Sequence, residues 1–189
     1  MATVRKISYS FITGAIGLLV IFGQGCLNPF APAVLGPSTV KAIVEQVTPD
    51  NVLHNFKYAY EHNDIDVYEN CLDKNFIFRY SDQDRTGTIV DVEVPRDGSS
   101  GDLERTRNLF SYFDEIKLDP WIPVFNRTEI VGEEVWQVYD VFFQLSVRDT
   151  DGNFGYEQFE ATGIAEFKFR QSDDDDLWRI VFWDDQSNQ

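Results

Sequence analysis

The chain has 189 residues, with 16 basic against 32 acidic side chains and a formal net charge of -16. This charge argues against a nucleic-acid partner, because contact with phosphates requires a basic surface. The 2 cysteines are too few for a disulfide framework or a four-thiolate zinc site, and the 43% apolar content is too high for a disordered chain. The length suits one domain preceded by a leader.

The first 25 residues have the pattern of an export signal. Arg5 and Lys6 precede an uncharged apolar run over residues 11–22, and small residues then lead to Cys26. A basic start, a short apolar segment and small residues before a boundary are typical of a secretory signal peptide. The run is shorter than the roughly 20 residues that a membrane-spanning helix needs. Residues 1–25 are therefore predicted to be a signal peptide.

Gly25 followed by Cys26 resembles the lipobox of bacterial lipoproteins, in which the cysteine is lipidated and becomes the new N-terminus. The resemblance implies a cell-envelope protein held at the membrane by lipid on Cys26, since two or more acyl chains anchor stably. Leu27, rather than Asp, follows the cysteine, which favours the outer membrane in a cell that has one. Gly23 stands where the lipobox usually has Leu, so a plain signal peptide and a short uncleaved anchor remain alternatives.

Residues 26–47 are predicted to be a lipid-anchored tether. Residues 27–37 contain three Pro and one Gly and carry no charge, a composition typical of extended linkers. Ser38 is expected to cap a short helix through Val40, Val44 and Val47. The folded domain is predicted over residues 48–189.

Three helices are predicted in this domain. Thr48 suits the N-cap and Pro49 the first position of a helix that ends near His62. Asp64 is expected to cap a second helix over residues 65–72, and a third helix fits residues 102–113. The first helix has apolar residues at helical spacing: Val52, Leu53, Phe56, Ala59 and Tyr60.

The other segments alternate between apolar and polar residues, as strands do. One strand is expected around Phe76–Tyr80, and a short one over residues 88–94. Asp151-Gly152 is a strong hairpin signal, and short turns between long strands indicate an antiparallel meander. The strands expected after the third helix cover residues 115–118, 121–129, 134–148, 154–171 and 177–183.

This order of elements resembles the nuclear-transport-factor-2-like (SnoaL-like) cone. The resemblance rests on the opening helix VLHNFKYAY (residues 52–60), the segment DIDVY (64–68) and the closing strand LWRIVFW (177–183). It implies an α+β fold over about residues 48–185, with a curved antiparallel sheet that curls around the helices and leaves a pocket at its open end. Members of the family include isomerases, dehydratases, epoxide hydrolases and domains without known activity, so the fold does not fix a function.

Alternation divides residues 134–148 between two faces of a sheet, and the more apolar set is expected to face the core. That set is Val135, Gln137, Tyr139, Val141, Phe143, Leu145 and Val147. Asp140 lies on the opposite face, beside Val138 and Phe142. If that face lined a dry pocket, Asp140 would be a candidate general base, because desolvation raises the pKa of a carboxyl. Alternation favours the other reading, a partly exposed acid on the more polar face.

Several aromatic residues are candidates for lining an apolar cavity, although most would serve equally well in the core. They are Tyr80, Trp121, Trp136, Tyr139, Trp178 and Trp183. Cys71 is predicted to be a small core residue rather than a nucleophile. His54 and His62 are too far apart for a helical zinc pair, and the acidic turns at 149–153 and 173–176 are predicted to be solvated. We therefore expect no metal and no cofactor.

Three functions remain open. No recognisable catalytic set is present, which favours a lipid-anchored binding or assembly domain outside the cytoplasm over an enzyme. The alternatives are a small-molecule acid–base enzyme of isomerase or dehydratase type that uses the cone pocket, and a structural protein that forms homodimers through the open sheet face. Inward-facing ionisable groups would favour the enzyme, an apolar cavity would favour a small apolar ligand, and an exposed apolar sheet patch would favour oligomers.

Overall fold

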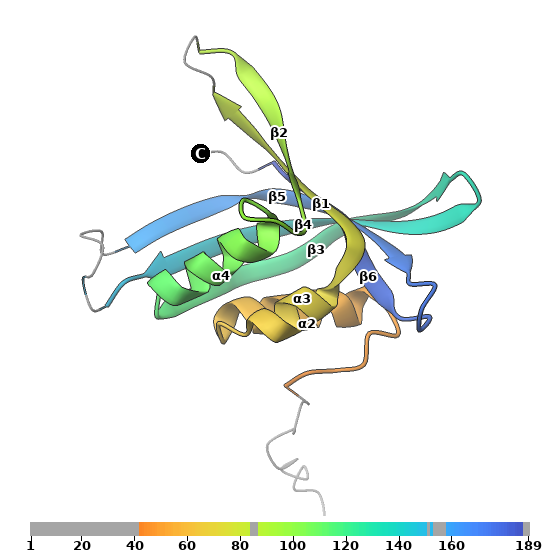
Figure 1. The fold of residues 1–189 in the computed structure, drawn as a ribbon, viewed down its shortest axis with the longest axis horizontal. Coiled ribbons are helices and arrows are strands. Elements are labelled where there is room, and N and C mark those ends of the chain that lie inside the picture. The colour runs from red at the N-terminus through yellow and green to blue at the C-terminus, as the bar shows by residue number, and fades with distance from the viewer. Residues whose placement is uncertain (1–41, 84–86, 151, 153–157, 187–189) are drawn as a thin grey trace, which may run out of the picture. The chain divides into compact units, whose positions relative to one another are not determined.

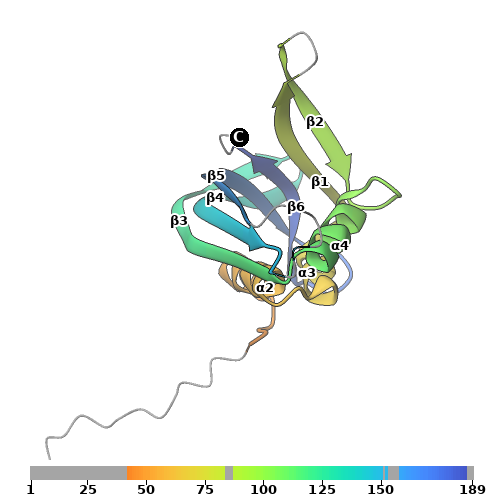
Figure 2. The same cartoon turned by 90° about the vertical axis from the view of Figure 1, so that its left-hand side faces the viewer.

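The computed structural model describes residues 42–83, 87–150, 152 and 158–186 (Figures 1 and 2). The predicted signal peptide, the lipidation of Cys26 and the tether up to residue 41 lie outside the described residues. Among the helices that are described, none is long and apolar enough to span a bilayer.

Helix α2 (Pro49–Glu61) begins where its capping residues predict. The Thr48 Oγ1 accepts a hydrogen bond from the Asn51 N–H at 3.3 Å. Pro49 occupies the first turn, where an N–H would have no helical partner, and Asp50 places a negative charge at the positive end of the helix. Three features of the sequence thus start this helix at one position.

Helices α3 (Ile65–Cys71) and α4 (Asp102–Tyr112) start in two different ways. Asp64 caps α3, and its Oδ1 accepts a hydrogen bond from the Val67 N–H at 3.1 Å. Gly101 precedes α4 without a side-chain cap. A Cβ at this position would lie 2.5 Å from the carbonyl of Asp97, so only glycine allows the chain this close approach.

Six strands form one sheet in the order β2-β1-β6-β5-β4-β3. All neighbours are antiparallel except β1 and β6, which run parallel. The last four strands form the predicted meander, and β6 connects it to the β1–β2 hairpin. The strands are β1 (Leu72–Gln83), β2 (Ile89–Pro95), β3 (Glu115–Val131), β4 (Glu134–Arg148), β5 (Gln158–Gln171) and β6 (Trp178–Asp185).

The strands curve over α2 and α3, and the β1–β2 hairpin extends away from these helices (Figure 2). The core lies between the helices and the inner face of the sheet. Phe56 of α2 is 1% exposed, and its ring contacts aromatic rings of β3, β5 and β6. The predicted α+β fold class, a curved antiparallel sheet on N-terminal helices, is confirmed.

The short helix predicted after Ser38 is absent from its described part, residues 42–48. The side chain of Asn55 instead pairs with the backbone of Val44. Asn55 accepts from the Val44 N–H at 3.0 Å and donates to the Val44 carbonyl at 2.8 Å. The carbonyl of Gln46 accepts a hydrogen bond from the first residue of β6 at 2.8 Å. The backbone of this segment therefore forms hydrogen bonds with the folded domain and not the internal hydrogen bonds of a helix.

The two strands predicted over 115–118 and 121–129 form the single strand β3. The sheet register shifts between Leu118 and Trp121, around Pro120. Proline has no N–H to give to the ladder, so the pattern of alternation breaks there although the strand continues through an irregularity.

Candidate functional site

A cavity of about 70 Å³, here called the cone pocket, lies between α2 and the inner face of the sheet. Side chains of α2 and of strands β3 to β6 surround it. They are Phe56, Tyr60, Leu118, Trp121, Phe143, Leu145, Ala161, Ala165, Phe167, Trp183 and Asp185.

Aromatic rings from five elements form much of the pocket wall. Phe56 and Tyr60 are four residues apart on α2 and therefore share one face of the helix. The ring of Phe56 is stacked with that of Trp121 at a centroid distance of 5.6 Å. Trp183 is edge-on to Phe56 at 5.5 Å and stacked with Phe167 at the same distance. These aromatic rings pack against one another and so fix each other's positions in the pocket wall.

One carboxylate, Asp185, lies among these apolar groups. It is two residues beyond Trp183 on β6, so both side chains point to the same face of the sheet. Burial raises the pKa of Tyr60 far above its ordinary value, and the charges of Asp102 and Asp185 raise it further. The indole Nε1 of Trp183 is buried and donates no hydrogen bond to a described residue.

A buried polar cluster lies behind Tyr60. The Tyr68 hydroxyl donates to Asp102 Oδ2 at 2.7 Å, and Tyr60 interacts through its hydroxyl with Tyr68 and Thr106. Asp102 is 3% exposed. Burial raises the pKa of Asp102 to about 6, although the hydrogen bond from Tyr68 and the charge of Arg105 act in the opposite direction. Hydroxyl groups thus connect the pocket wall to a carboxyl group at the start of α4.

Of the six aromatic candidates for the cavity, Trp121 and Trp183 line the cone pocket. Tyr139 faces the same side of the sheet, but its hydroxyl lies 3.5 Å from Asp50 at the start of α2. Tyr80 is on the β1–β2 hairpin, where its ring is stacked with Phe78 at 5.5 Å. Neither tyrosine lines the pocket.

Trp136 and Asp140 lie on the outer face of β4, on the opposite side of the sheet from the cone pocket. The Trp136 Nε1 donates to Glu134 at 2.7 Å. Asp140 is half-buried and forms an ion pair with Arg127 at 3.6 Å. Arg127 also pairs with Glu166 on β5. Asp140 therefore occupies the partly exposed position that alternation favours.

The predicted faces of β4 agree with burial over the middle and end of the strand, where Tyr139, Val141, Phe143 and Val147 are buried on the inner face. The prediction is wrong for Val135, which is 54% exposed, and Val138 is buried although it lies on the opposite face. Cys71 is fully buried, as predicted, and burial raises the pKa of its thiol to about 12. Sequence reasoning missed Asp185, although its spacing from Trp183 was an available signal. Among the described residues, no three His, Cys, Asp or Glu side chains are grouped so that they could hold a metal ion.

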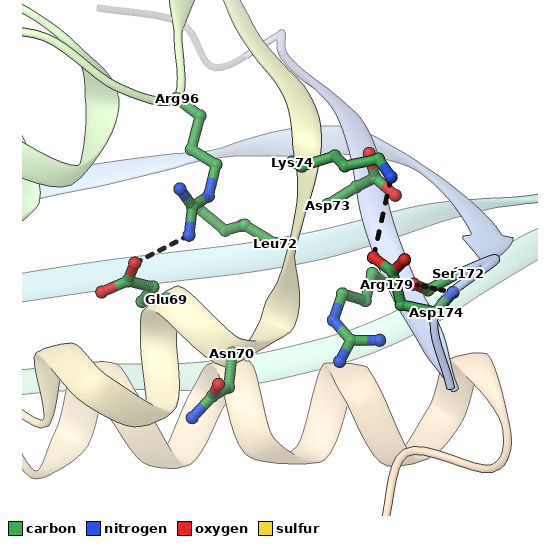
Figure 3. A pocket seen from close by; sticks show the side chains of 9 residues that line it. All are labelled: Glu69, Asn70, Leu72, Asp73, Lys74, Arg96, Ser172, Asp174 and Arg179. Carbon is green, nitrogen blue, oxygen red and sulfur yellow. Dashed lines mark hydrogen bonds and ion pairs between the residues drawn. The ribbon is translucent and has the colours of Figure 1, made fainter. Parts of the chain in front are cut away.

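A second hollow, of about 260 Å³, is polar and lies at the junction of α3, β1 and the β5–β6 turn (Figure 3). Each of its three basic side chains has an acidic partner. Arg96 pairs with Glu69 at 2.8 Å, Lys74 with Asp174 at 3.6 Å, and Arg179 with Asp175 at 2.7 Å. Since these charges already neutralise one another, the cone pocket is the stronger candidate site.

No protein-family model matches the chain, and no curated protein matches it. Several solved structures, by contrast, match the chain in their fold. A conserved protein from Planctomyces limnophilus is 14% identical over 74% of this chain and 92% of that chain, with a TM-score of 0.53. A protein from Kribbella flavida is 11% identical over 76% of this chain and 89% of that chain, with a TM-score of 0.51.

A nuclear-transport-factor-2-like superfamily protein from Salmonella enterica is 13% identical over 72% of this chain and 84% of that chain, with a TM-score of 0.48. The order of helices and strands in the chain, and the sheet curved around α2 and α3, are those that the resemblance implied. The chain thus has the α+β architecture expected of the nuclear-transport-factor-2-like cone. At these identities the likeness concerns the fold alone.

Proposed function

We propose that the protein is a binding domain that takes a small, largely apolar molecule into the cone pocket, and that lipid on Cys26 holds the domain at the bacterial cell envelope. The observation that carries the binding function is the aromatic cavity, because ligand sites are typically concave and apolar with a few placed polar groups. Asp185 and Tyr60 are the polar groups here.

The size of the cavity limits the ligand. About 70 Å³ is well below the roughly 300–1,000 Å³ of pockets for drug-sized molecules. We therefore expect a compact molecule, or a compact group at the end of a longer molecule.

Native mass spectrometry of the protein purified from its host tests this function, because it detects a co-purified small molecule directly. Ala161→Leu adds bulk to the cavity wall and is expected to remove the adduct. Thr162→Val is the matched control, since Thr162 is the next residue on β5, is exposed and faces away from the pocket. An adduct that survives Ala161→Leu unchanged would place the ligand elsewhere.

Metabolic labelling with a clickable fatty acid tests the anchor. The wild-type protein is expected to take up label, and the Cys26→Ser variant is expected to lose it. Equal labelling of the two proteins would show that Cys26 is not the modified residue.

A second candidate function is assembly with another copy of the chain through the outer face of the sheet. Ile122, Phe142 and Ile164 are aligned across β3, β4 and β5, and the two isoleucines are 50% and 41% exposed. Ion pairs on the same face, such as Lys168–Glu129 at 3.0 Å, compensate some of its charges and so reduce the repulsion between two acidic chains there.

Sedimentation velocity tests this assembly. The wild type is expected to sediment as a dimer at micromolar concentration and Ile164→Lys as a monomer. A monomeric wild type at the highest soluble concentration would reject the assembly and would leave ligand binding untouched.

A further inference from the structure

The wall of the cone pocket contains a hydrogen-bond donor without a partner. Trp183 lines the cavity, and its indole Nε1 is buried and donates no hydrogen bond to any group in the described part of the chain. A buried donor that is left unsatisfied destabilises the folded state, because the N–H has lost its hydrogen bond to water. Such groups are rare in folded proteins, so each one needs a physical explanation.

The packing around the indole shows why the fold supplies no acceptor. The Trp183 ring is stacked with Phe167 at a centroid distance of 5.5 Å and tilted against Phe78 at 4.5 Å. Phe56 meets it edge-on at 5.5 Å. Phenyl rings have no oxygen or nitrogen atom that could accept a hydrogen bond, so the neighbours that hold the indole in place leave its N–H unsatisfied. The cavity that Trp183 lines gives an acceptor a place from which to approach.

The rest of the pocket wall limits the kind of acceptor. The hydroxyl of Tyr60 already interacts with Tyr68 and Thr106, so it belongs to the buried cluster behind the wall. None of the residues that line the cavity is basic. An anionic acceptor such as a carboxylate would therefore find no counter-ion in the wall, and burying a charge without one is costly. A neutral oxygen avoids this cost.

We propose that the cone pocket is selective for a small neutral molecule with a carbonyl or ether oxygen on an apolar body, and that this oxygen accepts the hydrogen bond of the Trp183 indole. This inference rests on the proposed function, that the pocket binds a ligand, and names the chemical class of that ligand. The rings of Phe56 and Trp121 pack against the apolar body. A compact molecule of this kind suits a cavity of about 70 Å³.

The experiment compares cyclopentanone with cyclopentane, which has the same ring but no oxygen. Proton–nitrogen correlation NMR of the full protein observes the indole N–H groups of its 4 tryptophans, and a titration gives the affinity for each probe. The Trp183 signal is the one that Trp183→Phe lacks. We expect cyclopentanone to move the proton of this signal downfield, because a hydrogen bond deshields the donated proton, and we expect no downfield shift with cyclopentane.

Two variants separate the hydrogen bond from the aromatic wall. Trp183→Phe keeps an aromatic ring but removes the N–H, so it should weaken cyclopentanone about fivefold, as the loss of one hydrogen bond implies, and leave cyclopentane unchanged. Trp136→Phe is the matched control. It also removes an indole N–H, but Trp136 lies on the outer face of β4 and donates to Glu134, so this variant should change neither affinity.

The outcomes are distinct. A Trp183 signal that bound cyclopentanone leaves in place, as it would if water already satisfied the indole, overturns the inference and leaves the binding function standing. An equal loss of affinity for both probes in Trp183→Phe does the same. If neither probe moves any indole signal of the folded wild type at millimolar concentration, the inference and the ligand-binding function of this pocket are rejected together.

Discussion

Asp102 gives the sharpest test of the energetics of this fold. Its carboxyl group is 3% exposed at the start of α4, where it accepts a hydrogen bond of 2.7 Å from Tyr68. Burial raises the pKa of Asp102 from an ordinary 3.8 to about 6 in the folded protein. Asn at this position keeps an acceptor for Tyr68 but cannot ionise, so the pH dependence of the difference between Asp102→Asn and wild type reports the titration of Asp102.

The direction of the pH dependence of stability follows from the order of the two pKa values of Asp102, 3.8 in the unfolded chain and about 6 in the folded protein. Below pH 3.8 the carboxyl is protonated in both states, and Asp102 carries no electrostatic penalty. As the pH rises to about 6 the unfolded chain releases its proton first, so the stability falls, and above about 6 the full penalty remains.

At 1.36 kcal/mol per pKa unit, the shift from 3.8 to about 6 corresponds to a penalty of about 3 kcal/mol. At pH 4 the unfolded carboxyl is already more than half ionised, so about 0.6 kcal/mol of this penalty is present before the interval begins. We therefore expect the free energy of unfolding of Asp102→Asn, relative to wild type, to increase by about 2 kcal/mol between pH 4 and pH 7.

Urea unfolding followed by tryptophan fluorescence at pH 4, 5, 6 and 7 measures this difference. A constant offset, such as the cost of burying the Asn NH₂ group, affects every pH equally and does not change the slope. The titration of other acids cancels between the two proteins where their sites are independent. A difference that stays flat from pH 4 to 7 would show that Asp102 titrates alike in the folded and unfolded states.

Three further predictions concern buried groups. Burial raises the pKa of Asp73, but hydrogen bonds from Arg170 at 2.9 and 3.0 Å and from a backbone N–H lower it more, to below its ordinary value. Asp73→Asn should therefore cost about 3 kcal/mol in urea unfolding at pH 7, and the loss should shrink as the pH falls below about 4; a neutral effect at pH 7 would contradict this. Phe56→Ala should destabilise the domain by about 3–5 kcal/mol in thermal unfolding, and a loss under 1 kcal/mol would mean that the surrounding rings close the gap. Because burial raises the pKa of Cys71 to about 12, iodoacetamide at pH 8 should label it in a Cys26→Ser background only after unfolding, whereas rapid labelling of the native protein would show that the thiol is accessible.

The helices and the meander were predictable because their signals are local. Thr48, Pro49 and Asp50 start α2 through hydrogen bonds and charges within one turn. The strand predicted over 134–148 coincides with β4 at both ends, because its alternation is unbroken and charged residues bound it. Patterns of this kind depend only on residues that are near one another in the sequence.

Contacts between distant segments could not be predicted in this way. The parallel pairing of β1 with β6 joins segments about a hundred residues apart. Nothing in the sequence of either strand indicates which strand it will pair with. Asn55 likewise pairs with Val44 because the fold brings an extended backbone beside α2. As an isolated sequence, Val44 fits a helix equally well, since the competing hydrogen bonds exist only in the folded domain.

The two candidate carboxylates show why the site was harder to predict than the fold. The side chain of every second residue on a strand enters the core, so a shift of one position moves an acid from the pocket to the outer surface. Asp140 lies on β4 beside buried valines and was a natural candidate, but its parity directs it outward to Arg127. Asp185 lies beyond the predicted end of the closing strand at residue 183, and its parity on β6 directs it inward beside Trp183. The position of each residue along its own strand, rather than its chemistry, thus decides which carboxylate faces the pocket.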